Sequence, residues 1–369
     1  MSPPHLSSAN EETSCEEAAI VSRMREISGI IESNDAHPIF TLNHLAYEAG
    51  VSYGFIRSVV ARRINPYRHY EMRKRRGGYR VISSPVPDLA RVQRFILRKI
   101  LSVQRDNPAS YAYREGKSIK DCASRHIGSR WMIKMDIEDF FGSVNSKQVY
   151  FLFRDLGYSS LVSFELSRLV TWGCSPTAMN WQPYDYKISD YRHSIVGSLP
   201  QGAPTSGKIA NLIARDLDKS LHGLAKTYGA IYTRYSDDII FSFRRNITRP
   251  EARVIVKKSY DLMRANGFSP NLKKTAVIPP GARKIAVGLV VSDNVYLSRE
   301  FKRRTERLVH GVYKEGVVPF SERAKFRSPI GLINYIEGSL AFAAHIDRKW
   351  AEGQQQKLLS SMRKNTKIR

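Results

Sequence analysis

The sequence predicts an α+β protein, because its strand patterns form hairpins, which pair antiparallel, and other segments have apolar residues at helical spacing. Strand patterns on both sides of a turn occur in residues 72–85, 229–243 and 284–298. Helical spacing occurs in residues 41–64, 89–101 and from 299 onward. Hydrophobic residues make up 42% of the 369 residues and charged residues 25%, which suits a packed core and argues against wholesale disorder or a membrane protein. The length suggests two or three lobes.

The net charge indicates a partner that is a polyanion. The 59 Lys and Arg residues outnumber the 34 Asp and Glu residues, so the formal charge is +25. Residues 1–40 have a net charge of −5, whereas residues 57–130 have +14 and residues 299–369 have +9. Two basic lobes therefore flank a less charged middle, and nucleic acid is the expected ligand.

The cysteines and the N-terminus indicate the cellular compartment in which we expect the protein. Cys15, Cys122 and Cys174 are too far apart for a Cys-x-x-Cys metal or redox motif, and they do not make a disulfide framework. The N-terminus lacks a basic segment followed by an apolar run, and the chain has no stretch of about 18 apolar residues. We expect a cytoplasmic protein that does not contact a membrane.

The first third of the chain should contain helices and one hairpin. Residues 41–64 predict a helix, a turn at Gly50 and a second helix. Such a pair is either a DNA-reading helix-turn-helix or, more commonly, an ordinary packed helical pair. Residues 72–85 predict a basic hairpin that turns at Gly77-Gly78, and residues 89–101 predict an amphipathic basic helix. Residues 1–20 are expected to be irregular.

The middle of the chain should contain strands. Residues 130–141 begin as a strand, because Trp131, Ile133 and Met135 alternate with polar residues. Residues 229–243 predict a hairpin with a polar tip. Residues 284–292 and 294–298 predict a second hairpin with Asp293-Asn294 at its turn. Residues 173–197 are rich in Pro, Ser, Asn and Tyr and are expected to be irregular, whereas residues from 299 onward predict basic helices.

Three aspartates in the middle region carry the expected chemistry. Asp237 and Asp238 are adjacent at the tip of an apolar hairpin, where their mutual repulsion favours a divalent cation. Asp136 ends another predicted strand, and acids from neighbouring strands can hold two Mg²⁺ ions that activate a hydroxyl and stabilise a leaving phosphate. The alternative is that Asp-Asp is only a turn signal on a solvated hairpin, which is the commoner case for such a pair taken alone.

The order of five sequence blocks is similar to that of reverse transcriptases, and most similar to the retron branch. The blocks are MDIEDFF, SLPQGAPTS, YSDD, NLKKT and VGLVVS, and the upstream segments KRRGGYRVISSP and LARVQRFILRKIL resemble the finger blocks of that family. The resemblance implies a right-hand polymerase with four parts. These are an acidic extension (1–40), fingers with N-terminal helices (41–130), a palm with an antiparallel sheet and an insertion at about 173–197 (131–298), and a helical thumb with a basic tail (299–369).

The resemblance also implies roles for individual residues. Two Mg²⁺ ions would be held by Asp136, Asp237 and Asp238 together with the carbonyl of Ile137. Phe141 would pack under the sugar of the incoming nucleotide and select dNTPs, whereas Phe140 suits a plain core position.

The remaining roles concern contacts to the nucleotide. Gln201 and Gly202 would contact it, with Gly202 allowing close backbone approach. Lys74 and Arg80 resemble triphosphate clamps, although a solvated basic face is the alternative and Arg73, Arg75 and Arg76 are equally available. Lys274 resembles the lysine that protonates departing pyrophosphate, and Lys273 competes for that role.

The chain departs from the retron pattern at several positions. Cys122 stands where that block has Asn, four residues before His126, and a thiol cannot make the hydrogen bonds of an amide. His126 suits either a retained functional role or a plain core position. Val287 replaces the threonine of the Val-Thr-Gly block that contacts the RNA, Gly207 stands where proline is usual, and Ser236 replaces the alanine of the more usual YADD.

The resemblance implies RNA-directed DNA synthesis on a structured noncoding RNA, with a branched RNA-DNA product that stays bound. It further implies a role in antiphage defence with an effector or toxin protein as partner. About 70 residues follow Ser298, too few for a thumb and an RNase H domain, so we expect a host RNase H to degrade the template. The alternatives are a group II intron-like reverse transcriptase and an RNA-binding scaffold that mainly docks an effector.

Overall fold

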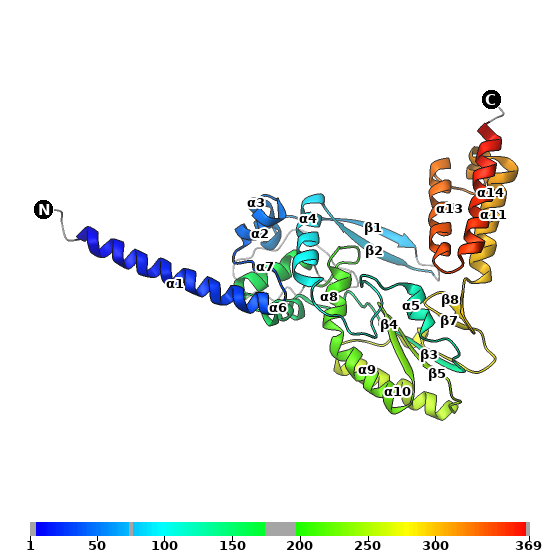
Figure 1. Cartoon of the computed structure of the whole chain (residues 1–369), viewed down its shortest axis with the longest axis horizontal. Helices are drawn as coiled ribbons and strands as arrows, with labels where there is room; N and C mark the ends of the chain where they lie inside the picture. Colours follow the sequence, from blue (N-terminus) through cyan, green and yellow to red (C-terminus); the bar gives the residue numbers. More distant parts are fainter. Residues whose placement is uncertain (1–4, 74–76, 174–196, 367–369) are drawn as a thin grey trace. The chain divides into compact units, whose positions relative to one another are not determined.

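The structure is a computed structural model that describes residues 5–73, 77–173 and 197–366 (Figure 1). The chain forms two compact units that interleave along the sequence. Unit 1 comprises residues 1–115, 136–223 and 257–272, and unit 2 comprises residues 116–135, 224–256 and 273–369. The described ranges contain no helix whose length and apolar character would let it cross a membrane.

Unit 1 begins with α1 (His5–Ser33), which overturns the expectation that residues 1–20 are irregular. The segment from His5 to Ser28 contains neither Gly nor Pro and is rich in Ala and Glu, so its helix propensity outweighs its acidic charge. The predicted helical pair is confirmed as α2 (Leu42–Ala49) and α3 (Tyr53–Val60). The Thr41 side chain caps α2, and Gly50 ends it with φ 63°.

The predicted basic hairpin is confirmed as β1 (Tyr67–Arg73) and β2 (Tyr79–Pro85), which pair antiparallel. Gly77 and Gly78 both have positive φ, as the tight turn requires. The helix expected over 89–101 is α4 (Pro87–Ile96), and its end widens into a π-helix, η1 (Leu97–Leu101), which the sequence pattern did not indicate.

The rest of unit 1 is helical. Its helices are α6 (Ser146–Asp155), α7 (Ser160–Val170) and α8 (Ser206–Ile213), while α9 (Arg215–Thr227) and α10 (Arg249–Ala265) pass from one unit into the other. The helices pack through fully buried residues: Ile56, Leu89, Ile96, Phe153, Tyr158 and Leu166. The segment expected to be irregular over 173–197 lies, from 174 to 196, outside the described residues.

Unit 2 contains a four-stranded sheet of order β4-β5-β3-β6. Its strands are β3 (Trp131–Asp136), β4 (Ile231–Tyr235), β5 (Asp238–Phe243) and β6 (Ala276–Ile278), and a short 3-10 helix, η2 (Leu272–Lys274), precedes β6. The division between the units falls at the last residue of β3 and at the first residue of η2, which both belong to unit 1. The helix α5 (Ile119–Ser124) packs on β4. Both the strand over 130–136 and the hairpin over 229–243 are confirmed.

A second sheet in unit 2 corrects the hairpin predicted over 284–298. Its strands are β7 (Lys284–Ala286), β8 (Leu289–Val291) and β9 (Val295–Tyr296), all antiparallel. The expected turn at Asp293-Asn294 is present. The segment 284–292 is two strands and not one, because Val287 with φ 44° and Gly288 with φ 87° form an additional turn. A β-branched residue rarely adopts positive φ, so Val287 disguised a turn that Gly288 alone did not reveal.

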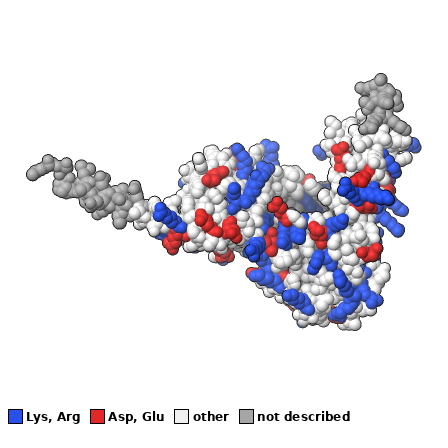
Figure 2. All heavy atoms as spheres, viewed as in Figure 1, with Lys and Arg blue, Asp and Glu red and all other residues white. Residues whose placement is uncertain are grey.

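Residues from 299 onward form the expected basic helices, which are α11 (Arg299–Glu315), α12 (Val317–Arg323), α13 (Pro329–Ala344) and α14 (Arg348–Thr366). Their common core consists of seven buried residues: Val309, Val312, Phe320, Leu332, Ile336, Leu340 and Leu358. Figure 2 shows basic side chains spread over the face drawn, with acidic ones between them. The α+β fold class is confirmed.

Candidate functional site

The hairpin β4-β5 presents Asp237 and Asp238 at its tip. Tyr235 pairs with Asp238 in the ladder, so Ser236 and Asp237 form a two-residue turn in which Ser236 has φ 57°. The fully buried Arg234 donates from Nη1 to the carbonyl oxygen of Ser236 at 3.0 Å. The turn that orients the two carboxylates is therefore fixed by a buried guanidinium.

The strand β3 ends with Asp136 at the same end of the sheet. The amide of Arg130, just before β3, donates to the carbonyl of Phe243 at the end of β5 at 2.7 Å, so these neighbouring strands run antiparallel. The end of β3 therefore lies at the end of the sheet where β5 begins. Asp136 is only 4% exposed, and its carbonyl accepts from the amide of Asn271 at 2.8 Å.

The register of β6 brings Lys274 to this end of the sheet as well. Ala276 lies opposite Lys134 in the antiparallel pairing of β3 with β6, so Lys274, two residues before Ala276, lies beyond the end of that ladder. Both Lys274 and its competitor Lys273 are exposed. The topology thus gathers four of the predicted catalytic and metal-binding residues at one sheet end, and Lys273 stays an alternative to Lys274.

The donor chemistry at this sheet end suits a hard divalent cation. Within residues 5–73, 77–173 and 197–366, no three His, Cys, Asp or Glu side chains form a group that could hold a metal by themselves. Mg²⁺ typically takes one or two carboxylates and completes its shell with water and substrate phosphates, and Asp237 and Asp238 are such a pair. Ile137, whose carbonyl was expected to complete the shell, is 1% exposed and forms an isolated bridge with Pro270.

His126 is a core residue that joins both strands of the Asp-Asp hairpin. It is fully buried, with Nδ1 2.7 Å from Oγ of Ser242 on β5 and Nε2 2.7 Å from Oγ1 of Thr233 on β4. Cys122 Sγ donates to the same Thr233 hydroxyl at 3.5 Å. Burial lowers the pKa of His126 to about 3, so its imidazole is neutral at any working pH. Of the two interpretations open for His126, the core position is the one the structure shows.

The contacts of Thr233 favour one tautomer of His126. If Thr233 accepts the weak Cys122 thiol hydrogen bond, its own hydroxyl proton is available to Nε2 of His126. The imidazole then carries its proton on Nδ1 and donates it to Ser242. The sequence did not single out Thr233 or Ser242, although a hydroxyl inside an otherwise apolar strand is a signal that could have found them.

Phe141 lies in unit 1 and packs against Tyr113, with ring centroids 5.9 Å apart. Phe140 is 4% exposed in the core, as expected, whereas Phe141 is partly exposed. A Cβ on Gly207 would lie 2.3 Å from the Tyr113 ring, so a proline at this position would displace Tyr113. Gly207 therefore makes room for the ring that supports Phe141. Nothing in the sequence marked Tyr113, whose φ is 55°.

Gln201 and Gly202 pack directly on β2. The Gln201 carbonyl accepts from the amide of Ser83 at 2.7 Å. Gly202 has φ 119°, and a Cβ there would meet Ser83 O at 3.0 Å, so close approach to β2 already requires glycine. Arg80 is exposed on β2, opposite Met72. Lys74 lies outside the described residues.

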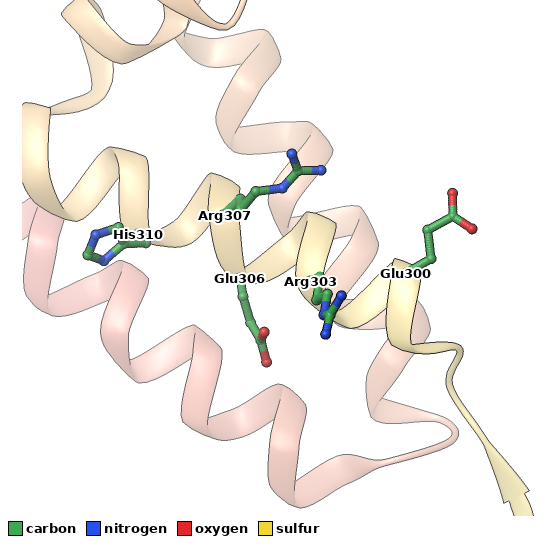
Figure 3. A pocket seen from close by; sticks show the side chains of 5 residues that line it. All are labelled: Glu300, Arg303, Glu306, Arg307 and His310. Carbon is green, nitrogen blue, oxygen red and sulfur yellow. The ribbon is translucent and has the colours of Figure 1, made fainter.

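A shallow open pocket of about 700 Å³ lies on α11. It is lined by Glu300, Arg303, Glu306, Arg307 and His310 (Figure 3). The side chains project from one helix in different directions, and Glu306 accepts from Nε1 of Trp350 at 3.0 Å. Such mixed charges without convergence do not form a catalytic site.

The chain is similar to known polymerases. The family described as "Reverse transcriptase (RNA-dependent DNA polymerase)" matches residues 72–291. Retron Ec86 reverse transcriptase of Escherichia coli is 30% identical over 286 residues, which cover 77% of this chain and 77% of that protein. Retron Mx65 reverse transcriptase of Myxococcus xanthus is 32% identical over 276 residues, which cover 73% of this chain and 62% of that protein. A solved telomerase from Candida albicans, in a complex with the TWJ fragment of telomeric RNA, has a TM-score of 0.43 at 12% identity and covers 82% of this chain and 56% of that one.

Proposed function

The chain belongs to the reverse transcriptase (RNA-dependent DNA polymerase) family, and from this premise we propose that it copies a structured noncoding RNA into a branched RNA-DNA molecule. Its activity is RNA-directed DNA synthesis, its fold is the right-hand polymerase predicted from the sequence, and its relatives are retron reverse transcriptases. The boundaries of the acidic extension, fingers, palm and thumb stay predictions. The observation that carries the proposal is the pair Asp237-Asp238 held on a rigid hairpin within this family.

In the proposed mechanism, the carboxylates of Asp136, Asp237 and Asp238 hold the divalent cations, which we take to be two Mg²⁺ ions. Bound cations would activate the primer hydroxyl and neutralise charge on the dNTP phosphates. The protein then contributes positioning, because phosphoryl transfer needs alignment more than covalent chemistry. Lys274, at the same sheet end, would donate a proton to the departing pyrophosphate.

On the nucleotide side, Phe141 would exclude a 2′-hydroxyl and so select dNTPs, with Tyr113 supporting its ring. Gln201 and Gly202 would contact the nucleotide from the segment that packs on β2. Lys74 and Arg80 of the basic hairpin would bind the triphosphate. These assignments come from position within the family blocks, and the packing of Phe141, Gln201 and Gly202 is compatible with them.

The hairpin that carries Asp237 and Asp238 is braced from inside. Arg234 fixes the turn through the Ser236 carbonyl, and His126 connects the two strands a few residues below it. Neither side chain needs to touch the substrate. Both are positioning residues in this proposal, since a metal site tolerates little displacement of its ligands.

We assign RNA recognition to the basic helices of residues 299–369, whose net charge is +9. Lys and Arg contacts to phosphates would supply affinity, while unpaired loops of the RNA would supply selectivity. Replacing these helices with those of a relative should transfer the RNA preference. A chimera that keeps its original preference would contradict this assignment.

The biological setting is also part of the proposal. By analogy with the retron branch, the RNA-DNA product would hold an effector protein in check during antiphage defence, and a host RNase H would trim the template. A group II intron-like enzyme, or an RNA-binding scaffold that mainly docks an effector, is the alternative. The cytoplasm is the proposed location.

The decisive experiment is to purify the full chain from its host and sequence the nucleic acid that copurifies. A covalent RNA-DNA species should accompany the wild type and be absent from the Asp237→Asn/Asp238→Asn double variant. Asp261→Asn is the matched control, because Asp261 is an exposed acid with only a surface ion pair to Arg264. RNA without DNA in every sample would contradict the polymerase proposal and favour the alternative of an RNA-binding scaffold.

A further inference from the structure

Two arginines lie close together in unit 1, at the corner where α3 and α7 end. Arg62 follows α3 in the left-handed region, with φ 57°, at a position where glycine is usual. The amide of Arg63 donates to the Ser58 carbonyl at 2.9 Å, which locks this helix end. Arg168 lies in the last turn of α7 and is 7% exposed. The side chain of Arg62 is partly exposed, but its Nη1 atom is buried.

The contacts of these two guanidiniums are aromatic rings and neutral oxygens. Arg62 lies over the Trp172 ring at 4.7 Å and donates from Nη2 to Oγ1 of Thr171 at 3.3 Å. Arg168 lies over the Phe164 ring at 5.5 Å and donates from Nε to the Val60 carbonyl at 3.2 Å. Within the described residues, neither guanidinium forms an ion pair with a carboxylate.

The acid nearest along α7 does not serve this purpose. The electrostatic partner of Glu165 is Arg57, and burial raises the pKa of Glu165. Among the described residues, the corner therefore holds two like charges without a counter-charge, which is unfavourable where the charged atoms are buried. Burial and the charge of Arg168 lower the pKa of Arg62 to about 9.

Hydrogen-bond donors at this corner also lack acceptors. Arg62 Nη1 and Trp172 Nε1 are both buried and have no hydrogen-bond partner in residues 5–73, 77–173 and 197–366. Gln93 lies beside them: its amide nitrogen donates to Tyr67 Oη at 2.8 Å and to the Leu169 carbonyl at 2.9 Å, while its Oε1 is unpaired. The unpaired donors are thus one guanidinium nitrogen of Arg62 and the indole N–H of Trp172, and the positive charge of Arg168 nearby favours an acceptor with negative charge.

We propose that Arg62, Arg168 and Trp172 form a binding site for a small oxyanion of the phosphate class. A guanidinium fork matches the geometry of phosphate oxygens, and the indole N–H supplies a third donor. The free donors have no accessible surface, so the site fits an isolated anion better than a phosphate within a nucleic-acid chain. None of these residues belongs to the sequence blocks assigned to catalysis.

The test is the thermal unfolding of the full chain, freed of nucleic acid and kept in EDTA, as inorganic phosphate replaces chloride at constant ionic strength. Phosphate should raise the Tm of the wild type and of Arg63→Met, because Arg63 is exposed and one residue away. The Arg62→Met variant should lose at least tenfold in apparent phosphate affinity. In phosphate-free buffer it should be no less stable than the wild type, because the variant removes a charge that no described carboxylate compensates.

Two further variants test whether a loss of phosphate binding comes from misfolding and whether phosphate binds at another site. Trp172→Phe keeps the ring and removes the N–H, so it should weaken phosphate binding severalfold without loss of fold. Arg80→Met should leave the phosphate effect unchanged, since Arg80 belongs to the proposed triphosphate clamp. A Tm that ignores phosphate, or a phosphate effect that Arg62→Met retains, would overturn the proposal.

The source of the phosphate group is tested by competition. A nucleoside 5′-monophosphate should bind no better than inorganic phosphate, and an RNA oligomer without terminal phosphates should not displace it. Displacement by that oligomer would show that a backbone phosphate occupies the corner and would contradict the assignment of a small free anion. Failure of this proposal leaves the polymerase experiment unaffected, because that experiment monitors a covalent RNA-DNA product.

Discussion

The protein contains two buried polar clusters that differ in one respect. Around His126 in unit 2, both ring nitrogens have partners at 2.7 Å, and the ring is neutral because burial lowers its pKa to about 3. Around Arg62 in unit 1, a guanidinium nitrogen and an indole nitrogen have no partner in the part of the chain that the structure describes. We call a cluster closed when its buried polar atoms all have partners, and open when some do not. A closed cluster stabilises one structure, whereas an open cluster that carries charge is suited to bind a ligand.

A third buried group shows how unit 1 treats a cation that serves only the fold. Lys208 on α8 is 6% exposed, as is its partner Asp106, and their charged atoms lie 2.7 Å apart. Lys208 also donates to the Gln104 carbonyl at 2.6 Å. Unit 1 thus pairs one buried cation with a carboxylate, whereas among the described residues Arg62 and Arg168 have no acid as a partner. The following substitutions examine this contrast.

The largest expected loss of stability follows from breaking the Lys208 pair. Lys208→Met leaves the Asp106 carboxylate buried with only the nearby Arg215 to offset it, which should cost about 3–5 kcal/mol of the free energy of unfolding. Urea denaturation measures the change. The control is Lys219→Met, whose ion pair with Asp216 is exposed and should contribute less than about 1 kcal/mol. Equal losses of unfolding free energy in Lys208→Met and Lys219→Met would mean that the buried pair is not special. Arg62→Met, which is expected to lose no stability, would then no longer differ from a buried paired cation.

The His126 cluster should respond next. His126→Leu leaves the hydroxyls of Thr233 and Ser242 buried without their partner, so we expect a loss of about 2–4 kcal/mol. Because the ring braces the hairpin that presents Asp237 and Asp238, kcat should fall while KM for dNTP changes little. His126→Gln keeps one donor and one acceptor and should recover part of both losses. A stable His126→Leu enzyme with full kcat would show that the brace is dispensable.

Most of the fold could be predicted because its signals are local. Gly77-Gly78 and Asp293-Asn294 mark turns by their own chemistry, and the helical spacing of apolar residues marks α2 to α4. The turn at Val287-Gly288 was missed because valine disfavours positive φ, and the start of α1 was missed because its acidic charge suggested irregular chain. At α1 the helix propensity of the residues was the better guide than their charge, whereas at Val287 the structure departs from the residue's own preference.

Some residues of the candidate site could likewise be predicted from the sequence, and others could not. The acids at the sheet end are visible in the sequence because their chemistry requires those residue types in that order. The partners of His126 lie more than 100 residues away, as does Trp172 from Arg62, and no spacing rule connects them. The packing of Tyr113 on Gly207 is equally non-local, so the sequence could show Gly207 as a departure from the family but not explain it.

A pH series can sharpen the comparison through His126 alone. Its pKa is about 3 in the folded chain and about 6.5 when unfolded, so the unfolded state binds the proton first as pH falls. The resulting stability is fully present above pH 6.5 and is lost between about pH 6 and pH 3, at about 1 kcal/mol per pH unit. Many carboxylates titrate in the same range, so the quantity to measure is the difference in slope between the wild type and His126→Gln. Identical slopes would mean that His126 is not desolvated as described.

The smallest effect is expected at Cys122, the weakest member of the closed cluster. Its thiol is buried, and burial, followed by the charges of Asp238 and Asp121, raises its pKa to about 11. At pH 8 the thiolate fraction is then about 100-fold below that of a cysteine with a pKa of 9, so alkylation by iodoacetamide in the native state should be slower by at least that factor. The measurement uses a Cys15→Ser/Cys174→Ser background and mass spectrometry, with the urea-unfolded chain as the reactive control. Cys122→Ser retains a donor for Thr233 and should change the free energy of unfolding by less than about 1 kcal/mol.

Rapid alkylation of the native chain would mean that the cluster around His126 opens to solvent. His126 could then no longer be regarded as holding the hairpin of Asp237 and Asp238 in place.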